Sequence, residues 1–201
     1  IAVSNMVCKD MNLVSQGYEK VLRSRFDDAR FFLQDDVKTA LGDRVKDLDG
    51  VTFQAKLGSI GDKVRGFRTL AGVIADKLGL DAAEKQQVDE IARLCKADLI
   101  TKMVGEFPEL QGDVGRYYAR QEGLDPVVAD GIRDHYLPKS VKDDFPASVP
   151  AAVVGLADRL DSLVGIGAAV KLPTGSADPF ALRRACLTSA AIIIKFGFRL
   201  D

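Results

Sequence analysis

The segment from Val88 to Val104 constrains the fold of this chain more than any other. Its apolar side chains recur at intervals of three and four residues, at Val88, Ile91, Leu94, Cys95, Met103 and Val104. This spacing is typical of a helix that turns one face toward a core. We therefore predict a helix that continues through this segment and is ended by Phe107-Pro108, since the residue before a proline disfavours helical geometry.

Asp98 lies on the apolar side of this predicted helix. An ionised carboxylate is costly to bury unless a cation, hydrogen-bond donors or a metal ion compensates it. Two interpretations stay open. Asp98 is either a core aspartate held by N–H groups or an arginine, or the remnant of a metal site.

The rest of the chain shows the same helical periodicity, so we predict an all-α fold. Val51–Gln54 is ambiguous between a strand and a helix, and the helix is favoured. The apolar faces include Tyr18, Leu22 and Phe26 in the first helix, Val164 in the penultimate one, and Phe180, Leu187, Ala190 and Ile194 in the last. Caps and periodicity predict helices over Ser15–Leu33 (N-cap Ser15), Asp62–Leu78 (closed by Gly79), from Asp81, over Gly115–Arg120, from Asp125 to about Tyr136, over Ala151–Val170, and from Asp178 to about Phe196.

The composition indicates a globular protein without a strong charge bias. Of 201 residues, 47% are hydrophobic and 28% charged, and the net charge is −1. Cys8, Cys95 and Cys186 show no metal-ligand spacing, so we expect free thiols in a reducing compartment, two of them buried. The most apolar run, Ala190–Ile194, is too short to span a bilayer. No signal peptide pattern opens the chain, which we expect to be a piece of a longer polypeptide.

Several blocks of the sequence resemble the beta subunit of bacterial-type, heterotetrameric glycyl-tRNA synthetase. The central block is Lys96–Gly112, which is similar to that family's Lys-Ala-Asp-Leu-Val-Thr-x-Met-Val-x-Glu-Phe-x-Glu-Leu-Gln-Gly segment. The resemblance covers nearly the whole chain in the family's order. The other blocks are Arg25–Phe32, Val51–Gly58, Gly115–Ala119, His135–Pro138, Leu156–Gly165 and Pro173–Arg184.

This resemblance implies a role in joining glycine to its tRNA at the expense of ATP. The implied partners are tRNA(Gly) and the alpha subunit, in an assembly of two alpha and two beta subunits, with no membrane. ATP and magnesium would be used by the full complex, and no cofactor is implied for this region, which has no synthetase active-site motif and is expected to be inactive alone. The implied location is the bacterial cytoplasm or an organelle.

The chain also resembles the HD phosphohydrolase superfamily, whose metal site uses a histidine, an adjacent His-Asp pair and a distant aspartate. Here Ala97 stands where the pair's histidine would be, next to Asp98, and Asp158 resembles the distant aspartate. Asp62–Leu78 contains no histidine, and His135 would be at most an auxiliary ligand. The resemblance implies an HD-like helical domain over residues 51–201 with a degenerate, metal-free site, after a connector over residues 1–50. A metal-dependent hydrolase of nucleotides or phosphate esters is the alternative.

Because the net charge is near zero, tRNA binding would need a local cluster of cations. Four of the five candidates form two pairs whose members are one helical turn or less apart, and these four can equally be surface arginines paired with aspartates. The candidate residues are Lys102, Arg116, Arg120, Arg183 and Arg184.

Overall fold

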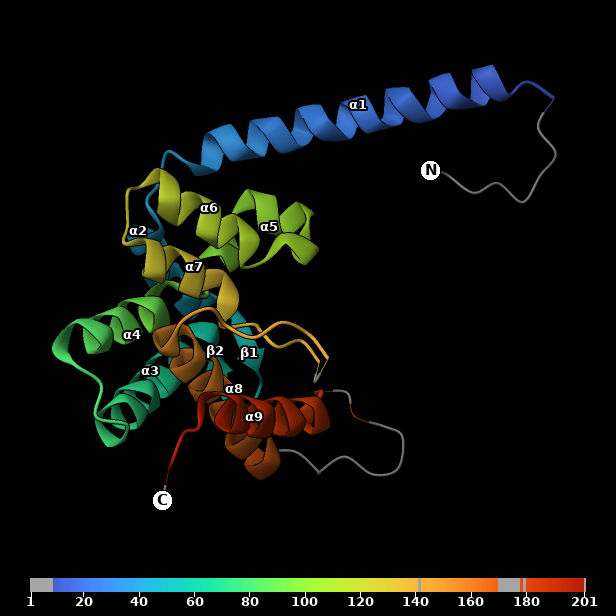
Figure 1. Cartoon of the computed structure of the whole chain (residues 1–201). Helices are drawn as coiled ribbons and strands as arrows, with labels where there is room; N and C mark the ends of the chain where they lie inside the picture. The colour runs from blue at the N-terminus through green and yellow to red at the C-terminus, as the bar shows by residue number, and fades with distance from the viewer. Residues whose placement is uncertain (1–8, 141, 170–177, 179, 201) are drawn as a thin grey trace. The chain divides into compact units, whose positions relative to one another are not determined.

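The computed structural model describes residues 9–140, 142–169, 178 and 180–200, and these confirm the prediction of an all-α fold (Figure 1). The elements are α1 (Met11–Asp36), α2 (Leu41–Arg44), η1 (Val45–Gly50), β1 (Thr52–Gln54), β2 (Gly58–Ser59), α3 (Ile60–Lys77), α4 (Ala82–Leu94), η2 (Ala97–Ile100), α5 (Lys102–Glu106), η3 (Pro108–Leu110), α6 (Asp113–Gln121), α7 (Pro126–Asp134), α8 (Val149–Ala169) and α9 (Leu182–Phe196), where η marks a 3-10 helix.

The chain divides into two compact units, residues 1–38 and residues 39–201. Leu41 and Leu48 lie in the connector over residues 1–50 that the sequence predicts, and both are fully buried. The segments that carry them pack with η2 and α3. The division between a connector and an HD-like domain at residues 50 and 51 stays a prediction. In the first unit, Tyr18, Leu22 and Phe26 are exposed.

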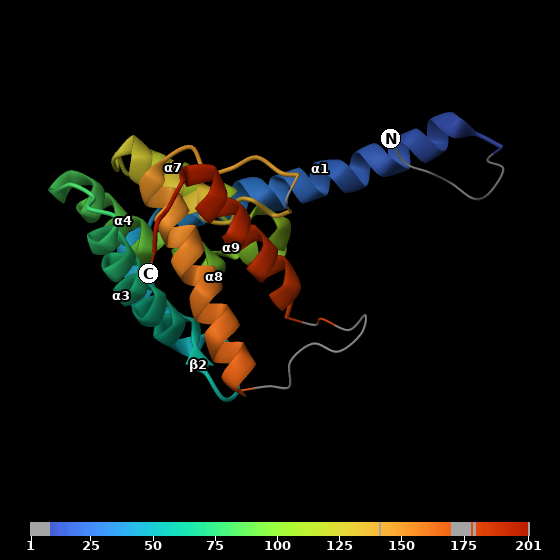
Figure 2. The ribbon, with the colours of Figure 1, turned by 60° about the horizontal axis from the view of Figure 1, so that its bottom comes forward.

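Helix α8 is the centre of the second unit. It packs against α3, α4, α7 and α9 (Figure 2). Its first half, Pro150–Ala157, is buried on every side. Small residues there let neighbouring backbones come close: a Cβ on Gly155 would lie 2.7 Å from the carbonyl oxygen of His135. A helix that is apolar all round is expected to be buried in this way.

The predicted continuous helix through Asp98 is wrong. Helix α4 ends at Leu94, and Asp98 lies in the 3-10 turn η2. The break is explained by Thr101, whose backbone is extended (φ −75°, ψ 151°) and whose hydroxyl accepts a hydrogen bond from the Val104 N–H to cap α5. Threonine stabilises a helix start in this way.

The weak preference for a helix at Val51–Gln54 is also wrong. Thr52–Gln54 forms β1, which pairs with β2 in an antiparallel hairpin. Gly58 has a φ of +85°, which a glycine adopts at little cost. Ser59 then caps α3 in a capping box with Asp62.

Helix starts follow the side-chain caps. Asp81 and Asp125 cap α4 and α7, as predicted. The first helix begins earlier than predicted, since Asp10 rather than Ser15 accepts the first N–H groups. The last begins later: Asp178 accepts hydrogen bonds from the N–H groups of Leu182 and Arg183.

Part of the predicted apolar faces is exposed. Val164, Phe180, Leu187 and Ile194 have exposed fractions of 72, 42, 59 and 80%, and Ala190 is exposed too, so their assignment to the core is wrong. Ile192 faces the core from α9 instead. Cys95 is buried but Cys186 is exposed, and Cys8 lies outside the described residues. No helix among the described residues is long and apolar enough to cross a membrane.

Candidate functional site: a buried lysine–aspartate cluster and its cavity

Asp158, in the middle of α8, is held between two lysines. Its Oδ1 lies 2.7 Å from the Nζ of Lys63, and its Oδ2 lies 2.8 Å from the Nζ of Lys96. Each lysine side chain is 7% exposed and that of Asp158 is 15% exposed. The two ammonium groups therefore contact both oxygens of one nearly buried carboxylate.

Each lysine comes from a segment next to the positions of the degenerate metal pattern. Lys63 is on α3, the helix that lacks the histidine of that pattern, and Lys96 directly precedes Ala97-Asp98. Lys63 also donates hydrogen bonds to Asp161 Oδ2 at 3.0 Å and to the hydroxyl of Ser162 at 2.7 Å.

Aromatic rings cover both ammonium groups. Lys63 Nζ lies 5.0 Å from the ring centre of Phe53, and Lys96 Nζ lies 4.1 Å from that of Tyr136. Such contacts are attractive when the cation is desolvated. The rings therefore compensate part of the cost of burying the two cations.

His135 is a neutral ring whose two nitrogens are both engaged. Nδ1 lies 2.7 Å from the carbonyl oxygen of Ile132, and Nε2 lies 2.8 Å from Lys96 Nζ. Because a carbonyl only accepts and an ammonium only donates, the proton is on Nδ1 and the lone pair of Nε2 points to Lys96. Burial and the charge of Lys96 lower the pKa of His135 well below its ordinary value, consistent with this tautomer.

The charges of the cluster stabilise each other. Burial alone would raise the pKa of Asp158, but Lys96 and Lys63 outweigh it, and this pKa lies far below its ordinary value. Burial alone would lower the pKa of Lys96, but Asp158 outweighs it and raises that pKa. The carboxylate of Asp158 and the ammonium group of Lys96 are therefore ionised at pH 7.

The residues at this position do not fit a divalent cation. The Nε2 lone pair of His135 is used by Lys96, and two ammonium groups hold the oxygens of Asp158, where they would repel a metal ion. Among the described residues, no group of three or more His, Cys, Asp or Glu side chains could hold a metal ion.

Asp98 is a core aspartate held by backbone N–H groups, which was one of the two interpretations of the sequence. It is fully buried, and its Oδ2 accepts hydrogen bonds from Gly112 N–H at 2.6 Å and from Gly115 N–H at 3.2 Å. Burial raises its pKa and these two N–H groups partly offset the rise. Through these two hydrogen bonds, Asp98 in η2 holds the turn at Gly112 and the first turn of α6 in place.

Arg159 fastens the end of α7 to α8. Its guanidinium donates to the carbonyls of His135, Gly155, Tyr136, Leu137 and Pro138 at 2.7–3.2 Å, and its Nε donates to the Thr188 hydroxyl. Burial lowers its pKa. Every nitrogen of this side chain donates a hydrogen bond within the protein. Arg159 therefore contributes positive charge to the cavity but has no nitrogen left without a protein acceptor.

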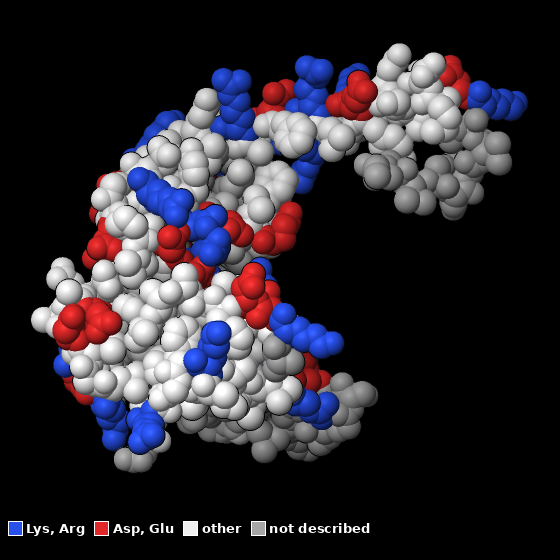
Figure 3. All heavy atoms as spheres, viewed as in Figure 1, with Lys and Arg blue, Asp and Glu red and all other residues white. Residues whose placement is uncertain are grey.

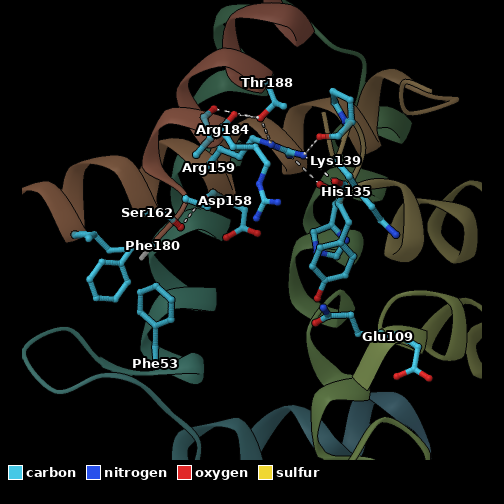
Figure 4. Close-up of a pocket in the computed structure, with 16 residues that line it drawn as sticks. Phe53, Glu109, His135, Lys139, Asp158, Arg159, Ser162, Phe180, Arg184 and Thr188 are labelled. Carbon is cyan, nitrogen blue, oxygen red and sulfur yellow. Dashed lines mark hydrogen bonds between the residues drawn. The ribbon is translucent and has the colours of Figure 1, made fainter. Parts of the chain in front are cut away.

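A cavity of about 430 Å³ lies beside the cluster (Figure 4). Phe53 and Phe180 lie next to each other at one side of it, while Lys139 and Glu109 lie at the other. The further lining residues are Gln111, His135, Tyr136, Pro138, Asp158, Arg159, Ser162, Ile166, Ala181, Arg184, Ala185 and Thr188.

The five cations that the sequence suggested for RNA binding lie on three different helices, α5, α6 and α9. Arg184 lines the cavity and Arg183 is its exposed neighbour at the start of α9. On α6, Arg120 lies 2.6 Å and Arg116 3.9 Å from the same oxygen of Asp130. Lys102 is exposed at the start of α5.

Charges of both signs are interspersed over the face of residues 39–201 seen in Figure 3. The cations of α6 belong to such a mixed arrangement, because Asp113 and Asp130 lie beside them. Arg183 and Arg184 differ from them in that no described residue makes an ion pair with either guanidinium.

Sequence reasoning missed the central residues of the site, Lys63, Lys96, Lys139 and Arg159. A signal existed for two of them. Lys63 lies four residues before Phe67 on the apolar side of α3, and Lys96 opens the very block that contains Asp98. A lysine on an apolar face implies a buried counter-charge, which would have pointed to Asp158.

These features describe an all-helical domain whose central polar cluster consists of ion pairs. A family model described as "Glycyl-tRNA synthetase beta subunit" matches residues 1–201. The chain is 51% identical over its full length to the "Glycine--tRNA ligase beta subunit" of Myxococcus xanthus (strain DK1622), of which it covers 28%. It is 47% identical over its full length to the protein of the same name from Geotalea uraniireducens (strain Rf4), of which it covers 29%. The chain belongs to the glycyl-tRNA synthetase beta subunit family and spans 28–29% of the length of these relatives.

Proposed function

We propose that this region is a non-catalytic, tRNA-binding module of the beta subunit of glycine–tRNA ligase. In this role it supports the ATP-dependent charging of tRNA(Gly) by an assembly with the alpha subunit, and ATP and magnesium are used elsewhere in that assembly. The proposal is supported by family membership over residues 1–201.

The observation that carries the non-catalytic part is the contact of Lys63 and Lys96 with both oxygens of Asp158. A phosphohydrolase of the alternative kind needs a divalent cation that activates water. Here ammonium groups occupy the carboxylate that would bind such an ion. This argues against hydrolysis of nucleotides or phosphate esters.

The RNA-binding part is supported by the cations at the start of α9. Arg183 and Arg184 have no ion-pair partner among the described residues, whereas Arg116 and Arg120 share Asp130. Guanidinium groups without a carboxylate partner can contact phosphates without first breaking an ion pair. Such contacts release counterions and make affinity depend on salt.

The test compares two double variants in the full beta subunit assembled with the alpha subunit. Arg183→Gln with Arg184→Gln should weaken tRNA(Gly) binding and reduce the slope of log affinity against log salt by roughly 1.4 to 1.8, for two phosphate contacts. Arg116→Gln with Arg120→Gln should change both quantities less.

Glycine activation without tRNA should be unchanged in both variants, which separates RNA binding from damage to the assembly. Unchanged tRNA affinity and salt slope in the Arg183 and Arg184 variant would refute an RNA contact at this site.

A further inference from the structure

The cavity beside Asp158 has features that the ion-pair cluster does not explain. Its volume of about 430 Å³ is within the range of small-molecule sites. Part of its inner wall is already satisfied internally, since Arg159 and Ser162 direct their polar atoms to protein partners. The groups left for a ligand are the hydroxyl of Tyr136, which has no hydrogen-bond partner among the described residues, and the groups around the opening.

One side of the opening is aromatic. Phe53 is half-buried, and Phe180 has an exposed fraction of 42%, although phenylalanine has no polar atom that benefits from solvent. Figure 4 shows the two rings close together at the same side of the cavity. Adjacent aromatic faces at an opening are suited to stack a planar base.

The other available groups are positively charged. Among the described residues, the side chains of Lys139 and Arg184 make no ion pair or hydrogen bond. Phosphate oxygens are the usual partners of such cations. Glu109, also at the opening, can accept hydrogen bonds from hydroxyl groups.

The deeper charges do not oppose an anion. The positive side chains that line the cavity or form an ion pair with Asp158 are Lys63, Lys96, Lys139, Arg159 and Arg184, and the negative ones that line it or form an ion pair with these lysines are Glu109, Asp158 and Asp161. Five positive charges against three negative ones leave a net charge of two positive, because His135 is neutral. Lys63 and Lys96 thus more than neutralise the charge of Asp158, so the inner end of the cavity does not repel a phosphate.

We propose that this cavity binds a nucleoside monophosphate without hydrolysing it, with the base against Phe53 and Phe180 and the phosphate near Lys139 and Arg184. Two sources share this chemistry: a free nucleotide, and an unpaired nucleotide of a bound tRNA. Only the second source depends on the proposed function.

The experiment uses the full beta subunit and 8-azido-AMP as a photoreactive probe. Saturable labelling should map to peptides that contain Phe53 or Phe180, and excess AMP should compete more strongly than adenosine because the phosphate contributes. Phe180→Ala and Lys139→Gln should each weaken labelling by roughly tenfold, the order expected for losing one stacking or phosphate contact.

Two matched variants serve as controls. Tyr117→Ala removes another aromatic side chain with an exposed fraction of 42%, and Lys85→Gln removes a surface cation, and neither residue lines the cavity. Both should leave labelling unchanged. Equal effects of Phe180→Ala and Tyr117→Ala would overturn the proposal.

Competition by tRNA(Gly) distinguishes the two sources. Loss of labelling with tRNA present assigns the cavity to an RNA nucleotide, and unchanged labelling assigns it to a free nucleotide. Absence of saturable labelling at these peptides up to millimolar probe overturns the inference. The proposed function would still stand in that case if the Arg183 and Arg184 variant lost tRNA affinity.

Discussion

Replacing Asp158 by asparagine should destabilise residues 39–201 strongly. The change keeps the size of the side chain but leaves Lys63 and Lys96 without the carboxylate that both contact at 2.7–2.8 Å. Removing one partner of a buried ion pair costs about 3–5 kcal/mol. Since Asp158 is 15% exposed, we expect the lower end, about 3 kcal/mol.

Urea unfolding of the beta subunit, followed by a probe in this unit, measures the effect. With a slope of about 2 kcal/mol per molar, the midpoint should fall by about 1.5 M. Asp161→Asn is the matched control, because Asp161 contacts only Lys63 of the two lysines and is 29% exposed. It should cost less than about 1 kcal/mol.

The pH dependence gives a second readout of the same variant. Without Asp158, burial lowers the pKa of Lys96, so the folded variant binds fewer protons than its unfolded chain below about pH 10. Its free energy of unfolding should therefore rise between pH 7 and 9, and the deficit relative to the wild type should shrink. A loss below about 1 kcal/mol that does not change with pH would refute the buried ion-pair cluster.

Three further outcomes follow from the packing and burial. Gly155→Ala should lower the free energy of unfolding, measured by thermal unfolding, by about 1–3 kcal/mol because its Cβ would meet a backbone carbonyl at 2.7 Å. Gly72→Ala, which has open space on α3, should raise it by about 0.5–1 kcal/mol. Equal effects of the two changes would contradict the close approach at Gly155. Burial raises the pKa of Cys95 to about 12, so iodoacetamide should label exposed Cys186 in the native protein and Cys95 only after unfolding. Because the pKa of His135 is lowered in the folded protein, the unfolded chain binds one more proton than the folded chain below about pH 6.5, and the free energy of unfolding should fall from pH 7 to pH 5. His135→Gln should flatten this decrease. An unchanged pH profile in that variant would show that another group titrates.

The helical elements could be predicted because their signals are local. Asp81 and Asp125 are side-chain caps that act within three residues, and the structure confirms both. The break at Thr101 could not be predicted from periodicity, because apolar residues on both sides of it keep a helical spacing while the backbone turns out of the helix.

The candidate site was only partly predictable for a different reason. The sequence pointed to Asp158 as a degenerate position, but its partners lie 95 and 62 residues earlier in the chain, on Lys63 and Lys96. Which lysines reach one carboxylate is decided by the packing of α3 and α4 on α8. Likewise, helical spacing alone placed Leu187 and Ile194 inside, whereas α9 turns Ile192 to the core.

The most direct test of the ion-pair cluster is calorimetric titration of the isolated beta subunit with Mn²⁺. The account predicts no stoichiometric high-affinity site at Asp158, because Lys63 and Lys96 hold its oxygens and Lys96 also engages the Nε2 lone pair of His135. Stoichiometric binding with micromolar affinity that disappears in Asp158→Asn would contradict it.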